Sequence, residues 1–175
     1  VGFLLLLLQG LSELVKRLAF LSGQGPNALD KEKRPSAEEE LAELPAVAQL
    51  FVRLCEIPSP SRHEEAIAEC VRSELAAIGA TITEDGAGAD IPAGCGNIVA
   101  RFPATAGGGT PIALCAHLDT VPNNGPIEVK LVDGYLTNHR SDILGGDNKS
   151  AVAAILEAAR RIVANAIPHA GFDVI

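Results

Sequence analysis

Two short stretches of this sequence hold the residue types that could do chemistry. In the first, His117 and Asp119 follow an apolar run that ends at Ala116. If that run is a strand, side chains two positions apart share a face, so Asp119 can accept a hydrogen bond from one ring nitrogen of His117. Such a bond fixes the imidazole tautomer and raises its basicity as a metal ligand. The alternative is an ordinary hydrogen bond at a strand end, with no metal.

The second stretch is Gly145-Gly146-Asp147-Asn148-Lys149-Ser150, which leads into a long amphipathic pattern. Its two glycines allow the backbone to approach other groups closely, which leaves Asp147 at the mouth of a predicted helix. An Asp at that place usually caps the helix. The alternative is a carboxylate ligand for a divalent metal held opposite His117, because Asp binds zinc beside His and can bridge two ions.

Two other kinds of site fit these stretches poorly. The glycines before Lys149-Ser150 are similar to a phosphate-binding loop, but Asn148 stands where that loop needs a glycine, and Asp147 would face the phosphate. A nucleophilic pair of Cys115 and His117 would need side chains that meet, whereas residues two apart on a strand point the same way in parallel. No cluster that would lower the thiol pKa is evident, so we expect Cys115 to serve in packing.

The elements that would position these residues alternate between helical and extended patterns. Apolar spacing predicts a helix over 45–55 with Pro45 in its first position, a second over 61–78 with Ser61 and Glu64 as a capping box, and a third from Ser150 to Val163. Short β-prone runs cover 81–83, 97–102 and 112–116, a hairpin covers 127–136, and a further strand begins at Phe172. Helices interleaved with buried strands favour an α/β layer fold.

Composition narrows the classes of protein. The chain has 175 residues, a formal charge of −8, 47% hydrophobic residues and 3% aromatic residues. The apolar content excludes disorder for most of the chain, and the acidic balance with few aromatic rings argues against nucleic-acid binding. The four cysteines form no C-x-x-C pair, so we expect buried free thiols in a reducing compartment, which favours a cytoplasmic location.

The first forty-four residues have a different character from the rest. Helical spacing of leucines from Leu4 to Leu18 predicts an amphipathic helix that packs on the main body or on a partner, and 23–43 is polar enough for a linker with about one helical turn. The apolar run 3–8 is too short to span a membrane. No basic residue precedes Lys16, so a secretion signal over 1–21 would have to be truncated, which is the alternative location.

The two stretches together resemble the cocatalytic zinc peptidases and deacylases related to aminoacylase, acetylornithine deacetylase and carboxypeptidase G. The likeness lies in Ala116-His117-Leu118-Asp119-Thr120-Val121 followed by Gly146-Asp147-Asn148-Lys149-Ser150. Upstream, Ile57-Pro58-Ser59-Pro60-Ser61 and Gly96-Asn97-Ile98-Val99-Ala100 are similar to that family's opening helix pair and first core strand. The resemblance is strongest to the peptidase-T-like (tripeptide aminopeptidase) branch and covers roughly 45–175.

The resemblance implies a fold, a reaction and roles for named residues. It divides the chain into 1–44 and a region over 45–175 that is the first part of a three-layer α/β catalytic domain with a mixed sheet. His117 would bind one zinc, Asp147 would bridge a pair of zinc ions (Co²⁺ or Mn²⁺ being alternatives), and the catalytic Asp119 would orient His117. The reaction would be hydrolysis of a peptide bond by a metal-bridged hydroxide with a Glu general base. Full-length relatives of this kind can be homodimers.

The resemblance also implies what this sequence lacks. The family's Glu-Glu pair and its later ligands would follow the strand at Phe172, so the matched positions supply two of about four zinc ligands. We expect His63, His139, Asp142 and His169 to be exposed rather than to replace them. The absence of methionine and the strand-like Gly171–Ile175 agree with a fragment that is inactive alone. The alternatives are a deacylase of N-acyl amino acids and a non-catalytic protein that retains the scaffold.

Overall fold

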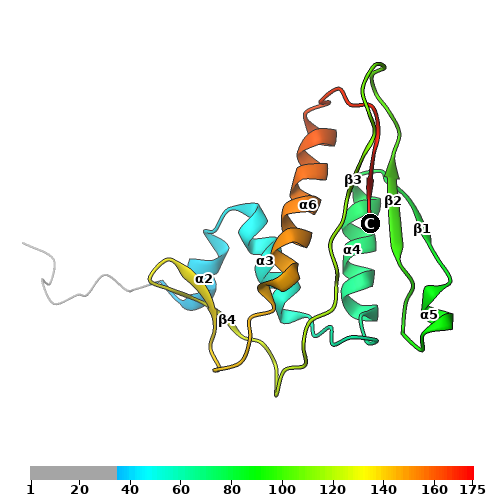
Figure 1. Ribbon diagram of the computed structural model, residues 1–175. Helices are drawn as coiled ribbons and strands as arrows, with labels where there is room; N and C mark the ends of the chain where they lie inside the picture. Colours follow the sequence, from blue (N-terminus) through cyan, green and yellow to red (C-terminus); the bar gives the residue numbers. More distant parts are fainter. Residues whose placement is uncertain (1–34) are drawn as a thin grey trace, which may run out of the picture. The chain divides into compact units, whose positions relative to one another are not determined.

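The computed structural model describes residues 35–175 of the chain (Figure 1). The chain divides into two compact units, Val1–Glu39 and Glu40–Ile175, and the predicted division after residue 44 stays a prediction. The helix expected over 4–18 lies outside the described residues. In the predicted linker, helix α2 (Ala37–Ala42) begins with a capping box, because the Ser36 amide donates to Glu39 Oε2 at 2.6 Å and the Glu39 amide donates to Ser36 Oγ at 3.2 Å.

A mixed four-stranded sheet forms the centre of the second unit. Its strands are β1 (Thr81–Glu84), β2 (Ile98–Phe102), β6 (Phe172–Val174) and β3 (Ile112–Leu114), in that spatial order. β3 runs parallel to β6, whereas β1 and β2, and β2 and β6, pair antiparallel. The last strand of the chain therefore lies in the interior of the sheet, between two strands that precede it.

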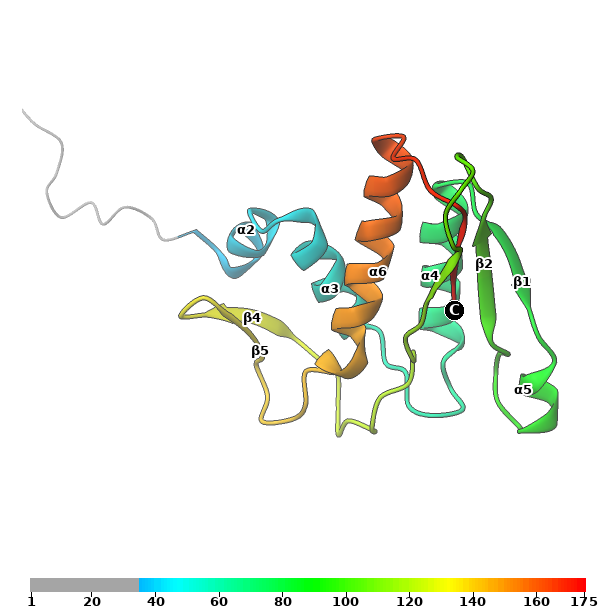
Figure 2. The same ribbon diagram turned by 45° about the horizontal axis from the view of Figure 1, so that its top comes forward.

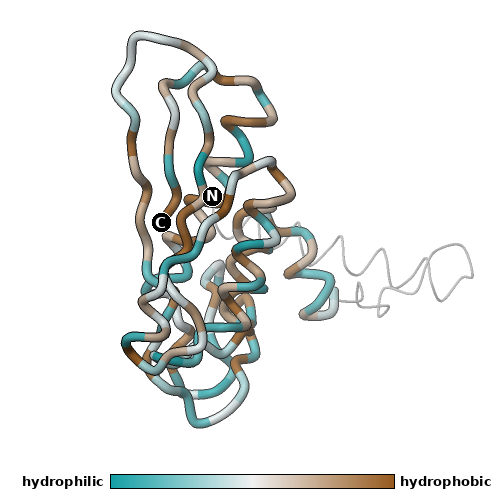
Figure 3. Tube along the Cα trace, turned by 90° about the vertical axis from the view of Figure 1, so that its right-hand side faces the viewer, coloured by the Kyte–Doolittle hydropathy of each residue, from teal (hydrophilic) through white to brown (hydrophobic). Residues whose placement is uncertain are grey.

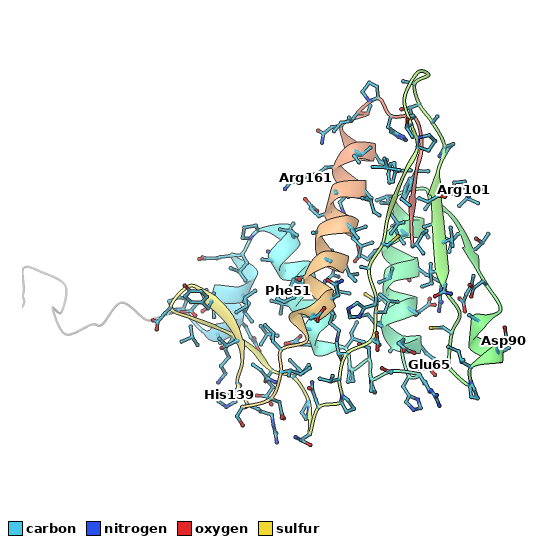
Figure 4. All side chains as sticks on the ribbon, in the orientation of Figure 1. Phe51, Glu65, Asp90, Arg101, His139 and Arg161 are labelled. Carbon is cyan, nitrogen blue, oxygen red and sulfur yellow. The ribbon has the colours of Figure 1, made fainter. Side chains whose placement is uncertain are left out.

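Helices cover one face of this sheet. α4 (Glu65–Ala77) and α6 (Gly146–Ala164) lie against the strands, and α3 (Ala46–Glu56) packs on α6 (Figures 1 and 2). Residues on β2 alternate between buried and more exposed, as expected for a strand with one covered face. The other face of the sheet carries Arg101, which Figure 4 shows on the side away from the helices and which forms an ion pair with Asp173. The mixed α/β class predicted from the sequence is confirmed, and the described elements form two of its layers.

The hydrophobic core fills the space between the sheet and its helices. It joins residues of α3, α4 and α6 to inward-facing residues of β2 and β6, namely Leu50, Leu54, Ile67, Val71, Leu75, Ala100, Phe102, Val152, Ala153, Leu156, Ala159, Phe172 and Val174. Phe102 and Phe172 stack with their ring centroids 4.4 Å apart. Hydrophobic and hydrophilic segments alternate along the trace in Figure 3, as amphipathic elements require.

A two-stranded ribbon stands apart from the main sheet. β4 (Val129–Val132) and β5 (Tyr135–Asn138) pair antiparallel around Asp133 and Gly134, which confirms the predicted hairpin. Ile127 and Val129 pack on Val52 and Cys55 of α3 in a small second cluster. None of the helices between residues 35 and 175 has the length and apolarity needed to cross a bilayer.

Two local predictions were wrong, and one short helix was missed. α4 begins at Glu65 rather than Ser61 and has no side-chain cap, so the expected capping box at Ser61 and Glu64 does not form. Pro45 is the N-cap of α3 rather than its first helical residue. The short helix α5 (Ala87–Asp90) was not predicted, because its Ala-Gly-Ala-Asp sequence has no apolar periodicity.

Candidate active site

The three residues predicted to carry the chemistry lie together. The ring of His117 stands between two carboxylates, with Nε2 3.1 Å from Asp147 Oδ1 and Nδ1 3.1 Å from Asp119 Oδ1. Nδ1 also lies 3.0 Å from the backbone carbonyl of Asp119. With two acceptors on one side, Nδ1 carries a proton and donates it, which leaves Nε2 as the nitrogen that faces Asp147.

The backbone reaches this arrangement differently from the prediction. β3 ends at Leu114, so His117 and Asp119 lie in an extended segment beyond the strand rather than on it. The ladder continues a little further, because the Ala116 amide donates to the Ile175 carbonyl at 3.0 Å. The pair therefore stands just past the carboxyl end of a strand, where open α/β sheets usually place their ligands.

Asp147 comes from the start of α6, where the backbone is irregular. Gly145 is the N-cap and has a left-handed φ of 84°, and Asp147 itself has non-helical angles of −95° and 102°. No side chain caps this helix, so the interpretation of Asp147 as a capping residue is wrong. The carboxylate is 92% exposed and turned toward the ring of His117, which is half exposed.

The hydrogen bonds of the site shift two pKa values. Partial burial alone would lower the pKa of His117, but its bonds to the Asp119 carbonyl and to the Asp147 and Asp119 carboxylates raise the pKa above its ordinary value. The pKa of Asp119 is lowered, chiefly because Ser61 donates a hydrogen bond to it and further because of His117. The same contacts thus favour the protonated form of the imidazole and the ionised form of Asp119.

The donor set fits a zinc ion. Two atoms that each lie about 2.0–2.1 Å from one tetrahedral zinc are about 3.3 Å apart, and His117 Nε2 and Asp147 Oδ1 are separated by 3.1 Å. An imidazole nitrogen and a carboxylate oxygen are ordinary zinc ligands, and the bond from Nδ1 to Asp119 is the usual support for a ligating His. Within residues 35–175, no group of three or more His, Cys, Asp or Glu side chains has metal-binding geometry, so these residues offer part of a site.

The other acidic and histidine residues lie elsewhere. Asp142 accepts a hydrogen bond from Asn124, and His169 packs its ring edge-on against Phe172. His139 lies beside the β4–β5 ribbon (Figure 4), and its amide donates to the Glu128 carbonyl. His63 is exposed. His139 is exposed as well, as expected, whereas Asp142 and His169 are half-buried, so the expected exposure was wrong for these two.

A cleft of about 620 Å³ opens beside His117 and Asp119. Its walls are mostly apolar and come from α4, α6 and the segments that follow β1 and β3. Cys95 and Cys115 also line it. Cys115 is exposed, so its predicted role in packing is wrong, and Cys55 is the one fully buried thiol among the four free cysteines, all of which lie in the described part of the chain.

Two residues beside the site were not recognised as part of it. Ser61 donates from its hydroxyl to Asp119 Oδ2, although its position before Glu64 matched a helix cap. Lys149 is fully buried and donates from Nζ to the Ile57 carbonyl at 2.6 Å. A lysine two residues after an acidic loop residue carries no signal of burial, so sequence reasoning had no means of finding it.

Comparisons with known proteins agree with this fold. The chain is 36% identical over 119 residues to the cytosol non-specific dipeptidase of Escherichia coli and 29% identical over 126 residues to the uncharacterized protein YqjE of Bacillus subtilis. These matches cover 61% and 71% of the chain, and 23% and 33% of the two relatives. No protein-family model matches the chain.

Three of the solved structures similar to this chain are peptidases by name. Aminopeptidase PepT of Bacillus cereus superposes with a TM-score of 0.70 at 29% identity, and a tripeptidase of Staphylococcus aureus with 0.68 at 27% identity. Both matches cover 73% of this chain and 34% of the other. The aminoacylhistidine dipeptidase of Vibrio alginolyticus gives 0.59 at 26% identity, over 77% of this chain and 28% of its own.

The resemblance predicted from the sequence is therefore confirmed. The structural neighbours are PepT-type tripeptidases and related dipeptidases, and the chain spans about a third of their length. Peptide hydrolysis is the activity that the names of these proteins share.

Proposed function

We propose that this chain supplies part of the metal centre of a peptidase that hydrolyses short peptides, as an aminopeptidase does. The observation that carries the proposal is the convergence of His117 Nε2 and Asp147 Oδ1 at 3.1 Å, with Asp119 holding the other ring nitrogen. Its support is that the fold is shared with a PepT aminopeptidase and a tripeptidase.

In this proposal His117 and Asp147 hold the metal, with Asp147 in the bridging position. When bound, zinc supplies a Lewis acid and lowers the pKa of a water molecule to about 7. Asp119 keeps the proton on Nδ1 of His117, so that Nε2 offers its lone pair. The cleft beside the pair is mostly apolar and can take up part of a peptide.

The remaining ligands and the general base belong to the proposal as well. Because the chain spans about a third of its relatives, we place them in sequence beyond these residues, where the resemblance puts a Glu-Glu pair. A cytoplasmic location is proposed on the free thiols and on the name of the cytosol dipeptidase. A homodimer of a longer protein stays a prediction.

The test is a hydrolysis assay on the protein expressed from its uninterrupted coding region, loaded with Zn²⁺, Co²⁺ or Mn²⁺. We expect release of the N-terminal residue from tri- and dipeptides, with a loss of at least about a hundredfold in His117→Ala. Ser73→Ala, a change at an exposed position of α4, is the matched control. Turnover of N-acyl amino acids alone would make the protein a deacylase, and peptide turnover unaffected by His117→Ala would refute the proposed site.

A further inference from the structure

The hydroxyl of Ser61 extends the line of contacts that runs through the candidate site. Ser61 Oγ donates to Asp119 Oδ2, and the other oxygen of the same carboxylate, Oδ1, lies 3.1 Å from His117 Nδ1. Each oxygen of Asp119 thus has its own partner, one on each side. The contacts form a continuous series from Ser61 through Asp119 and His117 to Asp147.

The backbone places Ser61 for this contact rather than for capping a helix. Directly after it, Arg62 adopts a left-handed φ of 76°, which an L-residue with a Cβ enters at a cost. The Arg62 amide donates to Glu64 Oε1 at 2.8 Å, so the Glu64 side chain bonds a different amide from the one that a capping box requires. The helix begins only at Glu65, and the Ser61 hydroxyl is left free to face Asp119.

Both segments that carry the pair are tied together beside it. The Thr120 amide donates to the Ser59 carbonyl at 2.8 Å, and Pro60 and Thr120 form an isolated parallel bridge. The residues next to Ser61 and the residue next to Asp119 are therefore held by main-chain contacts. Such contacts reduce the entropy that an exposed hydroxyl would otherwise lose on bonding a carboxylate.

The orientation of the Asp119 carboxylate depends on the same contact, because Ser61 holds Oδ2 while Oδ1 faces His117. An Asp side chain turns easily about its last torsion, and a donor fixed on Oδ2 restricts the plane in which Oδ1 can meet the imidazole.

We infer that Ser61 is a positioning residue, which holds the Asp119 carboxylate in the orientation that directs His117 Nε2 toward the metal position. The inference rests on the proposed function for its catalytic meaning, but the contact between Ser61 and the His117–Asp119 pair is a property of the chain itself. Ser61 does not itself line the cleft, and its contact with the site is the one with Asp119, so it acts through that carboxylate.

The experiment compares Ser61→Ala, Ser61→Thr and the control Ser73→Ala in the 175-residue chain. Ring ¹⁵N and Nδ1–H resonances of His117 are recorded by NMR without metal, and Zn²⁺ affinity is then measured by competition with a chromophoric chelator. We expect Ser61→Ala to shift and broaden the Nδ1–H signal of His117. We also expect it to weaken zinc binding about tenfold, which is the smallest loss usually seen when a residue that supports a metal ligand is removed. Ser61→Thr keeps the hydroxyl and should restore both readouts.

The two readouts separate the inference from the proposed function. Unchanged His117 resonances in Ser61→Ala would overturn the positioning role, whatever the zinc result. Changed resonances restored by Ser61→Thr, in a chain that binds no zinc, would support the positioning role and count against the proposed metal site. A loss of the His117 signals that Ser61→Thr fails to restore would also overturn the inference, since it would show that the side chain acts by packing.

Discussion

The ammonium group of Lys149 lies 2.6 Å from the carbonyl oxygen of Ile57, inside the protein. This contact joins the start of α6, which carries Asp147, to the segment that leads to Ser61. Burial lowers the pKa of Lys149, because the charged form loses its hydration. The two segments that meet at the candidate site are therefore fixed to each other by a buried charge-assisted hydrogen bond.

Shortening Lys149 should destabilise the fold. We expect Lys149→Ala to lower the free energy of unfolding by roughly 2–4 kcal/mol, because it leaves a cavity and a buried carbonyl without its donor. Lys149→Met keeps most of the volume and should lose less, about 1–2 kcal/mol. Urea unfolding followed by circular dichroism measures both, and a Lys149→Met chain as stable as the original would contradict a stabilising role for the bond.

Cys55 should make the fold less stable at alkaline pH. Burial raises the pKa of its thiol from 9.0 to about 12. At a pH between these two pKa values, the unfolded chain loses the proton and the folded chain keeps it. The contribution of Cys55 to the free energy of unfolding is therefore fully present below the lower pKa and is lost as the pH rises above it. The slope approaches about 1.4 kcal/mol per pH unit.

Urea unfolding from about pH 8 to about pH 11 tests this fall. It should become shallower in Cys55→Ala, where the raised pKa values of Cys70 and Cys95 still contribute to it. It should be unchanged in Cys115→Ala, which changes an exposed thiol and leaves Cys55 and its neighbour Lys149 as they are. Parallel curves for Cys55→Ala and the original chain would refute the assignment.

Phe172 should be one of the most costly residues to remove. It is 3% exposed, lies on the strand between β2 and β3, and stacks on Phe102. We expect Phe172→Ala to lower the free energy of unfolding by about 3–5 kcal/mol. Tyr135→Ala removes an aromatic ring that is 74% exposed and should change it by about 0.5 kcal/mol or less. Similar losses for the two variants would contradict the position of β6 in the sheet.

Gly145 should resist replacement because of its backbone rather than for lack of space. Its φ is +84°, whereas the atoms nearest to an added Cβ are at ordinary distances of 3.5 Å or more. We expect Gly145→Ala to cost about 1–2 kcal/mol of unfolding free energy. Gly107→Ala, at a position with open space and no positive φ, is the control and should be neutral or slightly stabilising. Equal effects would contradict the left-handed turn that leads to Asp147.

Local patterns predicted most of the elements but little of their arrangement. The apolar spacing of α3 and α6 and the Asp133-Gly134 turn depend on neighbouring residues, and these predictions were confirmed. The insertion of β6 between β2 and β3 depends on contacts about sixty to seventy residues apart in the sequence, and no local signal specifies it. Ser61 was predicted to cap a helix because the spacing of Ser61 and Glu64 matches a capping box. That local motif carries no information on the distant Asp119, whose carboxylate accepts the hydroxyl hydrogen bond instead.

The candidate site was predicted in part for the wrong reason. His117 and Asp119 were expected to meet because they share a strand face, whereas they meet in the extended segment after β3 ends. The approach of Asp147 to His117 could not follow from spacing, because thirty residues separate them. It was one of two interpretations of Asp147, and the resemblance favoured it over helix capping.

The central claim is that His117 and Asp147 form part of a divalent-metal site. Its most direct test is an NMR titration of the 175-residue chain with Zn²⁺, in which the ring ¹⁵N signals of the histidines are followed. We expect a saturable shift of His117 Nε2 that is weak in affinity, absent in Asp147→Ala, and not shared by His63, His139 or His169. No shift of His117 Nε2 up to millimolar zinc, or the same shift in Asp147→Ala, would contradict it.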